Sequence, residues 1–152
     1  MRITGENLMT AYGQALYNSY LVEHLLELTL KRAADSKVNG YLASYRKIEN
    51  LKLDEKIKEF GRVFPDVSAE VRALGLLRRI RNEITHAWLP QVESLLQTDE
   101  GWVQMHAMLV RYAAHVLELR NRIWDKYHGL VDNVNKNNSK RVVKSPVAHA
   151  QS

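Results

Sequence analysis

One apolar pattern in the second half of the chain constrains its fold most. Apolar side chains alternate at spacings of three and four from Trp102 to Ile123, and the pattern continues to Val134. This spacing places one apolar side chain per turn on the same face of an α-helix. It predicts a helix from Gly101 to about Asn135, roughly 50 Å long at 1.5 Å per residue. We expect part of so long a helix to pack on a partner.

The rest of the chain also has helical periodicity. Three further helices are predicted, over residues 6–34, 51–64 and 68–88. A polar segment at 35–40 and Pro65 separate them, and residues 41–49 form either a short helix or a loop. No segment alternates with the period of two that a half-buried strand requires. The predicted fold is therefore all-α, a bundle of four or five helices with a long C-terminal helix.

The charge distribution divides the chain into a body and a tail. The chain has 152 residues, the size of one domain, and a formal net charge of +5. Four lysine or arginine residues follow Asp132 with no acidic residue after it, so they contribute +4 and leave the body near +1. The expected organisation is one helical domain at 1–132 and a basic, disordered tail at 133–152.

Composition excludes several classes of site. The chain has no cysteine, which rules out disulfides, thiolate zinc sites and a cysteine nucleophile. His24 and Glu27, one turn apart, have no matching pair of ligands elsewhere, so neither a metal nor another cofactor is expected. No signal segment opens the chain and no run of about 18 apolar residues occurs, so we expect a cytoplasmic protein without membrane contact.

The helix predicted over residues 68–88 has two unlike faces. At 100° per residue one face carries the core stripe, which consists of Ala73, Leu77, Ile80, Ile84 and Ala87. Asn82 and His86 point nearly opposite to it, flanked by Arg78 and Arg79. Arg81 lies at the border of the stripe.

These polar residue types together suit the cleavage of RNA without a metal. Arginine binds phosphate through its planar fork of donors, and histidine transfers protons near neutral pH. One histidine cannot easily serve as base and acid on opposite sides of one phosphorus, so catalysis favours a homodimer that brings two copies of the helix together. The alternative is that these side chains are only a solvated helix face, with His86 favourable at a helix C-terminus.

The segment from Arg81 to His86 resembles the R-(polar)-x3-H motif of the HEPN superfamily, with Asn82 in the polar position. HEPN proteins are small all-α domains whose motif lies late on one helix and precedes a long final helix. Residues 56–61 and 74–77 are also similar to the approach to this motif in the mannitol-repressor-like branch.

The resemblance implies a metal-independent endoribonuclease with an RNA substrate, often a toxin or antiphage defence component held in check by a cognate antitoxin. In such families two copies of the motif form the site at a homodimer interface. Arg81 would then bind the scissile phosphate, His86 would act as general acid or base, and Asn82 would orient the site. The helix projection adds Arg78 and Arg79 as contacts to the RNA backbone.

Two features of the resemblance point to alternatives. Trp88 stands where toxins paired with a nucleotidyltransferase antitoxin often carry tyrosine, which puts that partner in doubt. Members of the mannitol-repressor-like branch are described as regulators. A non-catalytic regulator or protein-interaction module is therefore the second hypothesis, and a purely structural dimerisation domain the third.

Overall fold

The computed structural model describes residues 2–87 and 93–144, except the side chains of residues 87, 134 and 141–144. These residues form helices and no strand. The α-helices are α1 (Gly5–Asp35), α2 (Tyr45–Asn50), α3 (Leu53–Val63), α4 (Ser68–Asn82) and α6 (Asp99–Lys144). A π-helical turn, η2 (Glu83–Ala87), continues α4, and the short 3₁₀ helices are η1 (Val38–Gly40) and η3 (Leu95–Gln97). The predicted all-α bundle with a long C-terminal helix is confirmed.

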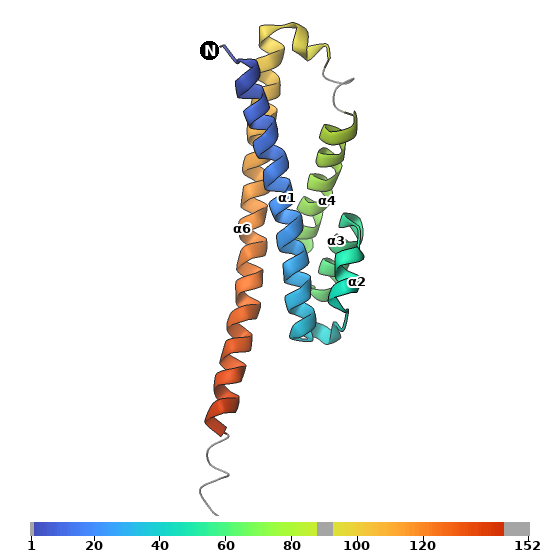
Figure 1. Cartoon of the computed structure of the whole chain (residues 1–152), viewed down its shortest axis with the longest axis vertical. Coiled ribbons are helices and arrows are strands. Elements are labelled where there is room, and N and C mark those ends of the chain that lie inside the picture. Colours follow the sequence, from blue (N-terminus) through green and yellow to red (C-terminus); the bar gives the residue numbers. More distant parts are fainter. Residues whose placement is uncertain (1, 88–92, 145–152) are drawn as a thin grey trace, which may run out of the picture.

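The two longest helices of the bundle, α1 and α6, lie side by side and run parallel to each other (Figure 1). The apolar residues of the α6 pattern are buried from Met105 to Ile123, and α1 is the helix that covers them. Asn18 of α1 donates from its buried side-chain amide to the backbone carbonyl of Ala113 at 3.2 Å, which fixes the register of the pair. Most of the apolar face of α6, from which we expected a partner, is therefore covered by α1 of the same chain.

The shorter helices α2, α3 and α4 lie along one side of α1 (Figure 1). The chain turns back after α1 through a segment in which Lys37, Asn39 and Gly40 have positive φ, as the predicted break requires. From there α4 runs antiparallel to α1 and α6, so its C-terminal end lies beside the middle and upper part of α1. This arrangement positions the residues of the motif against α1.

Side-chain caps start the two long helices. The Thr4 hydroxyl accepts from the backbone N–H of Asn7 at 3.1 Å, and Oδ1 of Asn7 accepts from the backbone N–H of Thr4 at 3.1 Å. At the start of α6, the Thr98 hydroxyl accepts from the backbone N–H of Gly101 at 3.0 Å.

Two predicted boundaries differ from the structure. Residues 133–144, expected from their composition to belong to a disordered tail, continue α6 as helix in the structure. The sequence has no proline or second glycine between Gly129 and Pro146 that would end the helix earlier. Residues 145–152 lie outside the described part of the chain. The helix predicted to run to Trp88 changes to a π turn after Asn82, and Trp88 itself is not described.

Within residues 2–87 and 93–144, no helix combines the length and apolar character needed to cross a membrane. The same residues contain no cluster of three or more histidine or acidic side chains that could hold a metal ion.

Gly101 provides a test of how tightly α6 begins. A Cβ atom on Gly101 would lie 1.9 Å from the backbone oxygen of Leu95, so alanine forces the first turn of α6 away from η3. We expect Gly101→Ala to lower the free energy of unfolding by about 2 kcal/mol, measured by urea denaturation. The matched control is Gly129→Ala on the same helix, where a Cβ meets nothing within 4 Å and should be neutral or stabilising. Equal stability of both variants would contradict the close approach.

Candidate functional site

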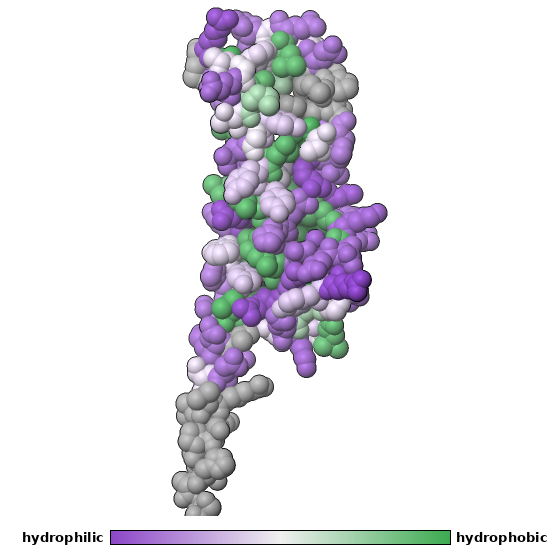
Figure 2. Space-filling model, viewed as in Figure 1, coloured by the Kyte–Doolittle hydropathy of each residue, from purple (hydrophilic) through white to green (hydrophobic). Residues whose placement is uncertain are grey.

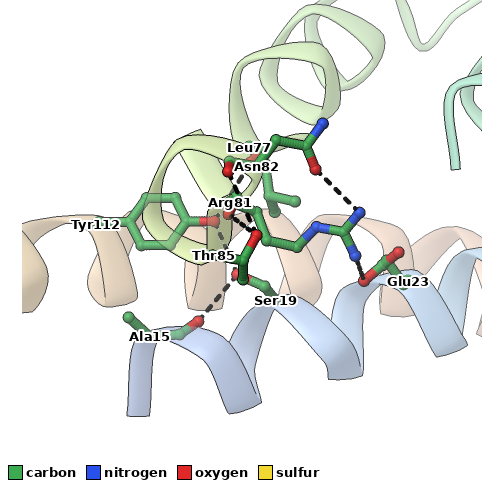
Figure 3. A network of polar contacts seen from close by, with 8 residues as sticks. All are labelled: Ala15, Ser19, Glu23, Leu77, Arg81, Asn82, Thr85 and Tyr112. Atoms are coloured by element: carbon green, nitrogen blue, oxygen red, sulfur yellow. Dashed lines mark hydrogen bonds and ion pairs between the residues drawn. The ribbon is translucent and has the colours of Figure 1, made fainter. Parts of the chain in front are cut away.

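Arg81 of α4 points to α1 and is paired there with a carboxylate. Its Nη1 lies 2.6 Å from Oε2 of Glu23, and its Nη2 donates to Oδ1 of Asn82 at 3.4 Å (Figure 3). The two charged side chains are 28% and 23% exposed, for arginine and glutamate respectively. The guanidinium therefore lies between an amide and a carboxylate, at a position that a ligand can still reach.

A buried polar network lies next to this ion pair and joins three helices. The hydroxyl groups of Ser19 on α1 and Tyr112 on α6 are 2.7 Å apart. Tyr112 also donates to the backbone carbonyl of Leu77 on α4 at 3.4 Å, as Figure 3 shows. Burial raises the pKa of Tyr112 above its ordinary value, although the hydrogen bond with Ser19 lowers it in part. The network keeps α4 at a fixed distance from the two long helices.

The C-terminal half of the motif lies on the π turn η2. In an α-helix, residues five apart such as Arg81 and His86 are separated by about 140° around the axis. A π turn closes its hydrogen bonds over five residues and winds more slowly, so it rotates His86 back toward the side of Arg81. The Thr85 hydroxyl donates to the backbone carbonyl of Arg81 at 2.9 Å and supports this turn. Single π turns inside helices occur frequently at functional sites.

The remaining predicted site residues face outward. Arg78, Arg79 and Asn82 line one open hollow on α4, of about 610 Å³, together with Arg72, Gly75, Leu76 and Glu83. Neither Arg81 nor His86 lines this hollow. His86 is exposed and forms no hydrogen bond or ion pair within the described part of the chain. The structure thus brings Arg81 against Asn82, keeps Arg78 and Arg79 beside Asn82, and leaves His86 accessible at the next turn.

The predicted core stripe of α4 is only partly buried. Leu77 and Ile84 are buried, whereas Ala73 and Ile80 are half-buried, and the side chain of Ala87 is not described. The prediction that the whole stripe is core is wrong because no described helix covers the side that carries Ala73 and Ile80.

That uncovered side opens into an apolar groove between α4 and α6, of about 660 Å³. Leu76 of α4 and Met108 of α6 line the groove and are 48% and 47% exposed. On the face drawn in Figure 2, apolar residues reach the surface along the middle of the bundle, between polar side chains at its edges. Leu76 and Glu83 line both the groove and the basic hollow, so the two surfaces are continuous.

Sequence reasoning missed Glu23, Ser19 and Tyr112 as parts of the site. Glu23 is 58 residues from Arg81, and nothing in the local pattern pairs them. Ser19 did leave a signal, because it interrupts the apolar stripe predicted for residues 6–34. A buried hydroxyl at such a position needs a polar partner, and Tyr112 is the phenol within the matching stripe of α6.

Loss of the Tyr112 hydroxyl should weaken the scaffold of the site. Tyr112→Phe leaves the buried Ser19 hydroxyl without its inter-helix partner, so we expect the free energy of unfolding to fall by about 1–2 kcal/mol. Tyr127→Phe, on the same helix, is the control, since its hydroxyl forms no hydrogen bond within the described residues. Urea denaturation of the two variants measures the difference. A Tyr112→Phe variant as stable as Tyr127→Phe would show that the network adds nothing to the docking of α4.

Comparisons of the chain with protein-family models, with curated proteins and with solved structures find no match.

Proposed function

We propose that this chain is a metal-independent endoribonuclease of HEPN type that cleaves RNA through attack of the ribose 2′-hydroxyl. The active form is a homodimer with the site at the subunit interface, and the protein acts in the cytoplasm as a toxin or antiphage defence component under the control of a cognate antitoxin or regulatory protein. The observation that carries the proposal is the local structure of the motif: Arg81 is held by Asn82 at the end of α4, and His86 is exposed on a π turn directly after it.

The geometry of Arg81 is compatible with phosphate binding. A guanidinium has five N–H donors, and two of the Arg81 donors bond to Glu23 and Asn82 within the described residues. The others can meet the oxygens of a phosphate, and the partly buried position strengthens that interaction relative to one in bulk water. Asn82 holds one edge of the guanidinium and thereby orients it.

The neighbouring groups supply proton transfer and backbone contacts. His86 is accessible, as a side chain that exchanges a proton with a leaving oxygen must be. Arg78 and Arg79 line the open hollow beside Asn82 and suit the phosphates on either side of the scissile one.

The homodimer is supported by the apolar groove. A second copy packed over it would bury Leu76 and Met108 and bring its own basic hollow alongside. The lining of the groove contains charged side chains of both signs. Arg111 and Arg122 are positive, and Glu83 and Glu118 are negative. A surface with paired opposite charges can match a two-fold copy of itself.

The groove and the ion pair of Arg81 also support a second candidate, a non-catalytic HEPN-like regulator or protein-interaction module. In that case Arg81 and Glu23 form a structural ion pair, and the groove binds an apolar helix of a different protein.

RNA cleavage separates the two candidates. In EDTA, the wild-type protein should cleave structured RNA to products with a 2′,3′-cyclic phosphate and a 5′-hydroxyl. Arg81→Ala and His86→Ala should each lower the cleavage rate at least about 100-fold, because one removes the phosphate-binding cation and the other the proton donor.

The controls for this assay are Arg46→Ala and His128→Ala, which remove exposed residues of the same types away from α4. Electrophoresis and end-group analysis of the products provide the readout. Cleavage by wild-type protein that does not exceed cleavage by Arg81→Ala and His86→Ala would exclude the enzyme.

The dimer has a separate test in the groove. Leu76→Glu places a charge on the apolar surface that the second copy covers, so light scattering at micromolar concentration should find a dimer for wild type and a monomer for the variant. Leu42→Glu is the control, since Leu42 is 73% exposed and outside the groove, and it should remain dimeric. A wild-type protein that is monomeric at this concentration would contradict the proposed dimer interface.

A further inference from the structure

Glu23 has a position that the proposed roles of the motif do not explain. It is the acidic side chain that reaches Arg81 from another helix, with Oε2 only 2.6 Å from Nη1 of the guanidinium. About a quarter of each side chain is exposed, so the pair lies at the surface of the site and not in the core. A carboxylate here is within reach of a substrate bound to Arg81.

On the basis of the proposed ribonuclease function, we propose that Glu23 is the general base that removes the 2′-proton of RNA, while His86 is the general acid. The reaction requires a base at the attacking oxygen and an acid at the leaving oxygen, on opposite sides of the phosphorus. Glu23 on α1 contacts Arg81 near the C-terminal end of α4, and His86 lies on the π turn η2 that directly follows α4. A carboxylate and an imidazole from separate elements can lie on opposite sides of a phosphate. A single histidine cannot be on both sides at once.

Arg81 makes the carboxylate compatible with an anionic substrate. A free carboxylate would repel the phosphate, but the guanidinium between them is attracted to both. One edge of the arginine fork then holds Glu23, and the remaining donors bind the non-bridging phosphate oxygens. The same contact fixes the carboxylate beside the place where the 2′-hydroxyl of the bound nucleotide must lie.

The step balances without a further reactant. The Glu23 carboxylate takes the proton of the 2′-hydroxyl, and the 2′-oxygen forms a bond to phosphorus. The bond from phosphorus to the 5′-oxygen breaks, and that oxygen leaves with the electron pair and receives a proton from the His86 imidazolium. The products are a 2′,3′-cyclic phosphate and a 5′-hydroxyl, after which Glu23 loses its proton to water and His86 regains one.

The surroundings of Glu23 favour it as the general base over Glu27, the next glutamate on the same helix. Arg81 of α4 and Tyr112 of α6 face Glu23, and His24 and Glu27 flank it along α1. Glu27 is already engaged by lysines, at 3.0 Å from Lys56 and 3.6 Å from Lys31. Burial would raise the pKa of Glu27, but these lysines outweigh it and hold that pKa below its ordinary value. The carboxylate that contacts the arginine of the motif is therefore that of Glu23, whereas Glu27 is paired with lysines outside the motif.

The direct test is Glu23→Gln, which keeps the size and hydrogen-bonding capacity of the side chain but cannot take a proton. We expect kcat to fall about 10²- to 10⁴-fold with little change in KM, and the acidic limb of the pH profile of kcat to disappear. Glu23→Asp should retain part of the activity and the acidic limb. The matched control is Glu59→Gln, which removes another glutamate–arginine ion pair, 2.8 Å from Arg62 and outside both the hollow and the groove, and should cleave at the wild-type rate.

Binding shows whether the variant is folded and able to hold RNA. An RNA with 2′-deoxy substitution at the cleavage site cannot react. Glu23→Gln should bind it at least as tightly as wild type, because one negative charge is removed beside the phosphate. A variant that binds normally but does not cleave has lost the proton acceptor, not the fold.

The other outcomes overturn the assignment in distinguishable ways. If Glu23→Gln has the kcat of the wild type while His86→Ala is inactive, the protein is a ribonuclease but Glu23 is not its general base. Faster cleavage by Glu23→Gln means that Glu23 competes with phosphate for Arg81. A lower kcat with the acidic limb preserved means that Glu23 only positions Arg81. Absence of cleavage by the wild-type protein itself removes the ribonuclease function and the base with it.

Discussion

The ion pair between Arg81 and Glu23 connects the motif on α4 to the long helix α1. The Arg81 side chain is 28% exposed, so its guanidinium has lost part of its hydration, and a contact with a carboxylate offsets that loss. Glu23 supplies that carboxylate, and the hydroxyl pair of Ser19 and Tyr112 next to it sets the distance between α1, α4 and α6. The position of the motif therefore depends on two polar contacts between helices that apolar packing alone does not specify.

The two surfaces that flank the motif differ in chemistry but share residues. On one side Arg78 and Arg79 make an open basic hollow, and on the other an apolar groove separates α4 from α6. Leu76 belongs to both, so a molecule that covers the groove also touches the edge of the hollow. With Glu23 as base, each phosphate requires a single histidine. In the proposed dimer, a second copy would bury the groove and extend the basic surface without supplying a second proton-transfer group.

The helices were predictable because their signals are local. Spacings of three and four in the apolar residues predict both α1 and α6. The sequence does not predict the continuation of α6 to Lys144, since the polar composition of this segment is typical of disorder although no residue there ends a helix.

The candidate site was predictable only in part, because only its local signals can be read from the sequence. The motif and its flanking arginines lie within one helical segment and can be recognised from spacing. The contact between Arg81 and Glu23 depends on how α4 docks against α1, which periodicity does not determine. The π turn inserts a change of winding at Glu83 that a projection at a constant 100° per residue excludes.

A crystal structure of the protein with uridine and vanadate, which together mimic a phosphorus under attack by a 2′-oxygen, tests the central claim most directly. We expect the vanadate oxygens within hydrogen-bond distance of the Arg81 guanidinium, the nucleoside 2′-oxygen at the carboxylate of Glu23, and His86 at the opposite apical oxygen. Vanadate bound only at Arg78 or Arg79, with the Arg81–Glu23 pair closed and His86 remote, would contradict the account.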